Sequence, residues 1–190
     1  MLFLVRHAET DRYLKKISQG WANNPINDNG IAQTEICADK VQRLKIAHFF
    51  SSDLLRSKQT ADILNKKLKM NIIYDARLRE INSGSVEGKI KTELPEDFIA
   101  DYKKNPHKYG AESQEDVFNR ARSFIDHLAS KNIDNALIVT HGGFIRLFRF
   151  ALEQKDWDTE KYATKKYPRV AHSEVIELDF SNHLKSDKDL

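Results

Sequence analysis

Two short apolar runs most constrain the fold of this chain. Leu2 to Val5 and Ala136 to Val139 are continuously apolar, and each run stops abruptly at polar residues. Continuous apolar character, rather than alternation, is typical of central strands that are covered on both faces, as in parallel sheets flanked by helices. We therefore expect two buried strands, far apart in the sequence, that belong to one sheet.

Strand-like and helix-like stretches alternate along the rest of the chain. Further strands are expected near residues 47–51, 71–74 and 175–180, and helical spacing of apolar residues indicates helices near 28–45, 56–69, 113–128 and 144–151. This order predicts an α/β fold, a three-layer α/β/α sandwich with a mostly parallel central sheet, formed as a single domain by residues 1–180.

Three stretches interrupt this alternation. Residues 11–28 and 77–88 are polar or irregular and are expected to be loops. Residues 89–111 contain two prolines around a short helix and are a candidate cap segment. Residues 181–190 form a polar tail that we expect to fray.

Composition and charge argue against several functional classes. The net charge of +3 comes from 31 basic and 28 acidic residues of interspersed sign, so neither nucleic acid nor an anionic membrane is an expected partner. Cys37 is the only cysteine, which excludes an intrachain disulfide and a cysteine metal cluster and fits a reducing compartment. The first apolar run is too short for a signal peptide or a membrane span, so we expect a cytoplasmic protein.

Charged and imidazole side chains follow three of the expected strands. Arg6 and His7 follow the first, Arg56 begins the helix after the second, and His141 and Gly142 follow the strand at 136–139. Parallel strands bring their carboxyl ends to one edge of a sheet, so these residues are expected to meet. Guanidinium groups bind phosphate bidentately and helix amino termini direct N–H groups at anions. The cluster therefore predicts a site for a phosphoryl group.

Phosphoryl transfer requires charge neutralisation, an in-line nucleophile and a proton donor for the leaving oxygen. A neutral imidazole can be the nucleophile. Glu80, in a loop beside Arg79, is the best placed candidate acid. The alternative is a metal site formed by His7, Glu9 and His141, which the two nearby arginines would disfavour by repelling a dication.

Five sequence blocks carry a resemblance to a known family. In chain order they are Arg6-His7-Ala8-Glu9-Thr10, Ser52 to Ala61, Leu78-Arg79-Glu80-Ile81, Gly84 with Glu87-Gly88, and Val139-Thr140-His141-Gly142-Gly143. They resemble the successive motifs of the histidine phosphatase superfamily, which has the phosphoglycerate mutase-like fold. The blocks span residues 1–150 in the family's order.

The resemblance implies a metal-independent phosphomonoesterase, a hydrolase that needs no cofactor and acts on a small phosphorylated substrate. It implies that His7 is phosphorylated transiently to a phosphohistidine intermediate. Arg6, Arg56 and His141 would bind the phosphoryl group. Glu80 would donate a proton to the leaving alcohol and then activate water.

The resemblance also bears on the substrate side of the pocket. It implies that Gln19 lines the pocket and that Thr10 and Gly142 add contacts. The family often has an asparagine six residues after the catalytic histidine, where this chain has Tyr13. The family's asparagine-x-serine near the last strand is replaced here by a triplet that begins with Ala171. Both departures bear on which substrate is bound more than on the chemistry that is expected.

Two other functions stay open. A phosphoglycerate mutase is disfavoured because the mutases to compare are longer, with extra segments that retain the phosphorylated product. A binding module for a phosphorylated ligand is disfavoured because His7 and Glu80 are both present. The sequence identifies neither the leaving group nor the oligomeric state. The remaining histidines, expected to be exposed or locally bonded rather than catalytic, are His48, His107, His127, His172 and His183.

Overall fold

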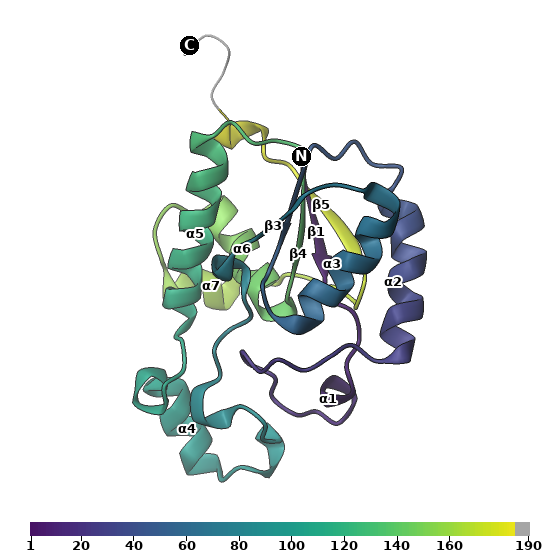
Figure 1. Ribbon diagram of the computed structural model, residues 1–190. Helices are drawn as coiled ribbons and strands as arrows, with labels where there is room; N and C mark the ends of the chain where they lie inside the picture. The colour runs from purple at the N-terminus through teal and green to yellow at the C-terminus, as the bar shows by residue number, and fades with distance from the viewer. Residues whose placement is uncertain (185–190) are drawn as a thin grey trace.

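A five-stranded sheet runs through the centre of the molecule with helices on both of its faces (Figure 1). The computed structural model describes residues 1–184. The strand order is β3-β2-β4-β1-β5, in which neighbours are hydrogen-bonded and only β5 runs antiparallel. The strands are β1 (Leu2–Arg6), β2 (His48–Ser51), β3 (Ile72–Tyr74), β4 (Ala136–Thr140) and β5 (Val175–Leu178).

Helices form a layer on each face of the sheet, which confirms the predicted α/β/α sandwich. One layer contains α2 (Asp28–Val41) and α3 (Leu55–Leu68), and the opposite layer contains α5 (Gln114–Ser130) and α6 (Gly142–Glu153) (Figure 1). The short helix α7 (Thr159–Thr164) lies on the α5 and α6 side. Within residues 1–184, none of the helices has the length and apolar character needed to cross a membrane.

Alternate residues of the central strands face opposite layers. Leu4 and Ile138 belong to the core formed with α5 and α6, whereas Val5 and Val139 belong to the core formed with α2 and α3. Both strands are therefore covered on each face, which explains their continuous apolar runs, and burying each such side chain contributes about 1.5–3 kcal/mol. β1 and β4 are direct neighbours from Leu2 opposite Ala136 to Arg6 opposite Thr140, so the two runs form the centre of the sheet.

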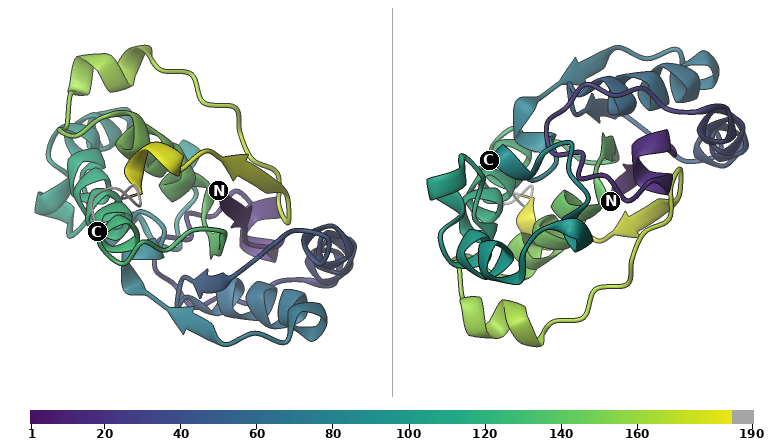
Figure 2. Two further views of the ribbon diagram at one scale, coloured as in Figure 1. Left: turned by 90° about the horizontal axis from the view of Figure 1, so that it is seen from above. Right: turned by 90° about the horizontal axis from the view of Figure 1, so that it is seen from below.

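The segments that follow the parallel strands fold over one edge of the sheet. Helix α1 (Asp11–Leu14) and helix α4 (Glu96–Lys104) both lie across this edge when the molecule is seen from below (Figure 2). Two isolated bridges, Ile17 to Ile90 and Ser83 to Ala111, connect these segments. The helix expected within residues 89–111 is confirmed, whereas α1 and α7 were not predicted. The 3-10 turns that follow β3 and precede α5 are Ala76–Leu78, Gly84–Val86, Lys91–Glu93 and Pro106–Tyr109.

A short turn follows β5. Ser181–His183 form a 3-10 turn, in which the Ser181 N–H donates to Asp179 Oδ1 at 2.9 Å, and Leu184 packs against the core. The buried ring of Phe180 stacks on His183 beside this turn, and the fraying of the tail stays a prediction. The rest of the expected tail, residues 185–190, lies outside the described residues.

Candidate active site

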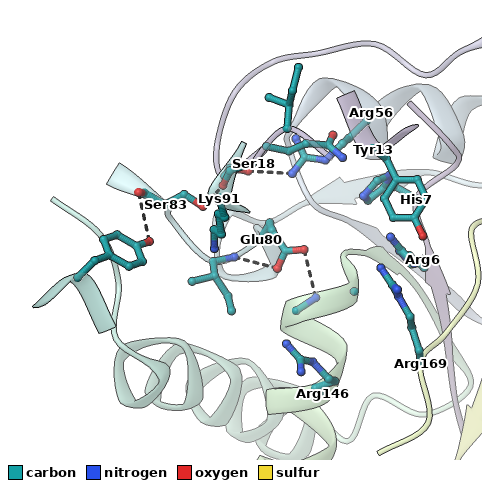
Figure 3. A pocket seen from close by; sticks show the side chains of 17 residues that line it. Arg6, His7, Tyr13, Ser18, Arg56, Glu80, Ser83, Lys91, Arg146 and Arg169 are labelled. Atoms are coloured by element: carbon teal, nitrogen blue, oxygen red, sulfur yellow. Dashed lines mark hydrogen bonds between the residues drawn. The ribbon is translucent and has the colours of Figure 1, made fainter. Parts of the chain in front are cut away.

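A cavity of about 560 Å³ opens at the carboxyl edge of the parallel strands (Figure 3). Its wall includes the end of β1, the loop that contains Gln19, the start of α6 and the segment that contains Lys91. One acidic side chain, Glu80, lines it. The cationic side chains in its wall are Arg6, Arg56, Lys91, Arg146 and Arg169. The cavity is therefore suited to an anion.

His7 leaves β1 with its ring held in one tautomer. Its Nδ1 lies 2.7 Å from the carbonyl oxygen of Ala8, which can only accept, so Nδ1 carries the hydrogen and Nε2 keeps its lone pair. The side chain is buried. Burial, followed by the positive charge of Arg56, lowers the pKa of His7 well below its ordinary value. His7 is therefore a neutral imidazole with Nε2 free, which is the form that a nucleophile requires.

Arg56 and Arg6 are each held by carbonyl groups of the backbone. Arg56 donates from Nη1 and Nη2 to the carbonyl oxygens of Ala22 and Gly20 at 2.9 and 2.8 Å, and Arg6 donates from Nη1 to Val170 at 2.9 Å. The Nε of both arginines is buried without a hydrogen-bond partner among the described residues. Both arginines line the cavity, so the positive charge of their guanidinium groups would stabilise an anion bound there. Burial lowers the pKa of Arg56 to about 10, which leaves it cationic at neutral pH.

His141 lies beside His7 at the N-cap of α6. The ring centroids of the two histidines are 5.1 Å apart. His141 Nε2 lies 2.8 Å from Ser52 Oγ and 3.2 Å from Ser57 Oγ, whereas its buried Nδ1 has no partner within residues 1–184. Burial and then the charge of Arg56 lower the pKa of His141 well below its ordinary value. His141 thus shares the neutral state of His7, but it is not a residue of the cavity wall.

Glu80 is fixed at the amino terminus of α6. Its Oε1 accepts the N–H groups of Ile81 and Phe144 at 2.9 and 3.1 Å, and its Oε2 accepts the N–H of Gly143 at 3.1 Å. A Cβ at Gly143 would lie 2.4 Å from Glu80 Oε1, so the carboxylate occupies the space of a side chain. Arg120 of α5 donates to the Glu80 carbonyl at 3.0 Å and holds the loop against the core. The first turn of α6 therefore orients the acid.

The three residues predicted to contact substrate occupy different places. Gln19 lines the cavity, and its Oε1 accepts from Thr10 Oγ1 at 3.1 Å and from Asn24 Nδ2 at 2.7 Å, which leaves the amide Nε2 for a ligand. Thr10 is fully buried, caps α1 and does not line the cavity. Its direct contact with substrate stays a prediction. Gly142 lines the cavity, where a Cβ would lie 3.1 Å from Arg6 Nε.

Glu9, the acid of the alternative metal set, is hydrogen-bonded to two asparagines at the start of α2. Its Oε1 accepts from Asn27 Nδ2 at 3.2 Å and from Asn29 Nδ2 at 2.9 Å, so it holds the start of α2. In the part of the chain that the structure describes, no three histidine, cysteine, aspartate or glutamate side chains are grouped so that they could hold a metal ion.

His172 is a part of the site that sequence reasoning missed. Its Nδ1 donates to the backbone oxygen of His7 at 2.9 Å, and its ring centroid lies 5.3 Å from that of His7 and 4.4 Å from that of Tyr13. Burial and then the charge of Arg6 lower the pKa of His172 to about 4. The histidine is locally bonded, as expected, but its partner is the candidate nucleophile. Its position in the Ala171-His172-Ser173 triplet, where the sequence departs from the family pattern, was the available signal.

Three cavity cations were also missed. Arg146 follows the glycines of α6 by one turn, a spacing that places it on the same side of the helix and that could have been noticed. Arg169 lies in the segment between α7 and β5, and Lys91 lies in the segment proposed as a cap. No local pattern identifies these two residues, because tertiary folding of long connections brings them to the cavity.

Comparison with known proteins identifies the family. The model of the histidine phosphatase superfamily (branch 1) matches residues 2–181. A putative phosphoserine phosphatase 2 from Hydrogenobacter thermophilus is 33% identical over 148 residues, which cover 75% of this chain and 73% of that protein. Phosphoglycerate mutase-like protein 4 from Arabidopsis thaliana is 30% identical over 155 residues, which cover 76% of this chain and 67% of that protein.

A solved phosphatase structure shares the fold. The structure of a mycobacterial glucosyl-3-phosphoglycerate phosphatase in complex with VO3 superposes with a TM-score of 0.78 and 25% sequence identity, covering 92% of this chain and 88% of that one. The chain therefore belongs to the histidine phosphatase superfamily and is a phosphatase of that class. The resemblance drawn from the five sequence blocks is confirmed.

Proposed function

We propose that this chain is a metal-independent phosphomonoesterase that hydrolyses a small phosphorylated metabolite through a phosphohistidine on His7. The observation that carries the proposal is the state of His7. Its Nδ1 is occupied by the Ala8 carbonyl at 2.7 Å and its pKa is well below the ordinary value, so Nε2 presents a lone pair to the cavity. Arg6 and Arg56 line the same cavity, where their guanidinium groups can neutralise the charge of a phosphoryl group.

In the first step, His7 Nε2 attacks phosphorus as the bond from phosphorus to the ester oxygen breaks. Arg6, Arg56 and the Gly142 N–H bind the phosphoryl oxygens, and the protonated carboxyl of Glu80 gives its proton to the leaving oxygen. Oε1 of Glu80 already accepts two N–H groups, whereas Oε2 accepts one, so Oε2 has the free position for that proton.

In the second step, water attacks the phosphohistidine. The Glu80 carboxylate takes a proton from the water as the new bond to phosphorus forms and the bond to His7 breaks. Inorganic phosphate leaves, and both His7 and Glu80 return to their starting states. The phosphatase names of the bacterial relative and of the mycobacterial structure support hydrolysis as the net reaction.

The test is phosphate release from a panel of phosphomonoesters by EDTA-treated wild type and by His7→Ala. His127→Ala, which changes a histidine on α5 outside the cavity, is the matched control. We expect turnover by wild type and control, and a loss of at least about 10³-fold in His7→Ala. An acid-labile, alkali-stable phosphoenzyme in wild type would identify the intermediate. Activity that disappears with EDTA, or interconversion of phosphoglycerates without phosphate release, would refute the proposal.

A further inference from the structure

Three cations of the cavity have no acidic partner. Elsewhere in the described chain, some arginines pair with carboxylates, as Arg77 does with Asp75 and Arg79 with Asp53. Lys91, Arg146 and Arg169 line the cavity and make no ion pair within 4.0 Å with any acid of residues 1–184. In the proposed function, Arg6, Arg56 and the start of α6 already bind the phosphoryl group. The additional positive charge is therefore available to another part of the ligand.

Arg169 is held next to Arg6 by an aromatic ring. The guanidinium carbons of Arg169 and Arg6 lie 5.5 and 5.1 Å from the centroid of Tyr13, so two like charges share one ring. After burial, the charge of Arg169 is among the causes that lower the pKa of Arg6. Figure 3 shows both side chains extending toward the same end of the cavity. Their repulsion is unfavourable in the free protein, and an anion bound to each of them would reduce it.

Arg146 lies on the side of the cavity where the leaving group departs. Glu80 marks that side because it is the proposed proton donor, and it accepts the N–H of Gly143 at 3.1 Å. Arg146 is three residues further along α6, so it lies about one turn beyond this contact on the same side of the helix. Figure 3 shows Arg146 beyond Glu80 in the cavity wall. Arg146 is thus placed to meet the leaving group rather than the transferred phosphoryl group, whereas Arg169 adds positive charge to the cavity beside Arg6.

We propose that the leaving group of the substrate carries a second anion, a carboxylate or another phosphoryl group, and that Arg146 and Arg169 bind it. This inference rests on the proposed function, since it assigns the substrate class of the same site. Guanidinium groups recognise either anion through charge-assisted, bidentate hydrogen bonds. Tyr13, where the family pattern has asparagine, is the platform that keeps Arg169 in position.

The test compares esters that differ in the second anion alone. 3-Phosphoglycerate and glycerol 3-phosphate differ by a carboxylate in place of a hydroxymethyl group, and fructose 1,6-bisphosphate and fructose 6-phosphate differ by one phosphoryl group. We expect wild type to prefer the more anionic member of at least one pair by roughly 10- to 100-fold in kcat/KM. The pair with the larger preference identifies the anion.

Charge-removing variants assign that preference to residues. Arg169→Gln and Arg146→Gln are each expected to lower the ratio of kcat/KM between the pair by about tenfold. Lys166→Gln and Arg149→Gln are matched controls, because they remove the same charge from the same segment and the same helix outside the cavity, and they should keep the ratio. Equal loss for both members of a pair in Arg169→Gln would make it a ligand of the phosphoryl group and overturn the inference.

A binding measurement separates this inference from the proposed function. Calorimetric titration of His7→Ala, or of His7→Asn should the first variant not fold, reports affinity for each ester without turnover. Tighter binding of the anionic member, with no phosphate release by wild type, would support the second-anion site and refute the phosphatase mechanism. Phosphate release with equal kcat/KM and equal affinity within both pairs would support the mechanism and refute the second-anion site.

Discussion

Gly143 is required by the carboxylate of Glu80 rather than by the conformation of its own backbone. A Cβ at this position would lie 2.4 Å from Glu80 Oε1 and 3.0 Å from Ile81 Cδ1, both of which belong to side chains. We therefore expect Gly143→Ala to fold, because a side chain can move where backbone cannot, and to displace Glu80 from α6. Without a placed proton donor, kcat/KM should fall by about 10²-fold for alkyl phosphates and much less for p-nitrophenyl phosphate, measured as phosphate release.

Glu80→Gln is the reference for this prediction. It should show the same dependence on the leaving group, and adding Gly143→Ala to it should cost little more, since both changes remove one proton donor. A loss in Gly143→Ala that is equal for alkyl and aryl esters would mean that the glycine serves the phosphoryl site instead of the acid.

At the scale of elements, Gly84 lets the 89–111 segment approach the loop after β3. Gly84 has a φ of +48°, and a Cβ there would lie 2.1 Å from the backbone oxygen of Tyr109 and 2.6 Å from the carbonyl carbon of Gly110. This segment supplies Lys91 and Tyr102 to the cavity wall. We propose that it is a cap on the site, as its sequence indicated.

Gly84→Ala is expected to loosen this segment without unfolding the sheet. The clash is with backbone and the conformation is left-handed, so the free energy of unfolding should fall by about 1–3 kcal/mol. Hydrogen exchange should accelerate at amides of residues 89–111 and stay slow in β1 and β4. Gly110→Ala is the control, because Gly110 also has a positive φ, +67°, but nothing lies within 4 Å of its Cβ position. Equal acceleration in both variants would assign the effect to backbone strain alone.

Elements differed in how well the sequence predicted them, for physical reasons. Buried strands such as β4 and long amphipathic helices such as α5 have a periodic pattern, and both were predicted within two residues of their observed starts. Helices α1 and α7 were missed because one or two turns are too short to show a period. The sequence also could not predict that β5 runs antiparallel, because apolar spacing does not depend on strand direction.

The residues of the site also differ in how well the sequence predicted them. Arg6, His7 and His141 were predictable because they lie at the ends of buried strands that meet at one edge of the sheet. His172 and Arg169 reach the site at the end of a long connection from α6 to β5, and the path of that connection is set by tertiary contacts rather than by local pattern. The meeting of these side chains was therefore predictable from strand ends, whereas the positions of His172 and Arg169 were not.

At the scale of the whole molecule, the site is a cluster of buried or half-buried histidines beside a cationic cavity. The ring centroids of His141 and His172 lie 5.1 and 5.3 Å from the ring centroid of His7. Burial lowers the pKa of all three, and the nearby arginines lower it further, chiefly Arg56 for His7 and His141 and Arg6 for His172. The folded protein therefore opposes protonation of all three rings.

This arrangement predicts how stability depends on pH. In the unfolded chain the three histidines bind protons near pH 6.5, whereas the folded protein keeps them neutral to lower pH, in the case of His172 to about 4. The unfolded state thus binds more protons below about pH 6.5. The free energy of unfolding should be highest above pH 6.5 and should fall toward pH 5 by up to about 1.4 kcal/mol per pH unit for each histidine.

Urea unfolding between pH 7.5 and 5 in phosphate-free buffer measures this slope. The window excludes carboxylates such as Asp53, whose lowered pKa affects stability only at more acidic pH. His172→Gln should reduce the slope, because one of the three protonation sites is gone while an amide retains hydrogen bonding to the backbone of His7. Added phosphate should raise stability at every pH by mass action, since the anion binds the folded state alone. Stability that stays level or rises as pH falls from 6.5 to 5 would show that these histidines are not held neutral, and the lone pair assigned to His7 Nε2 would lose its basis.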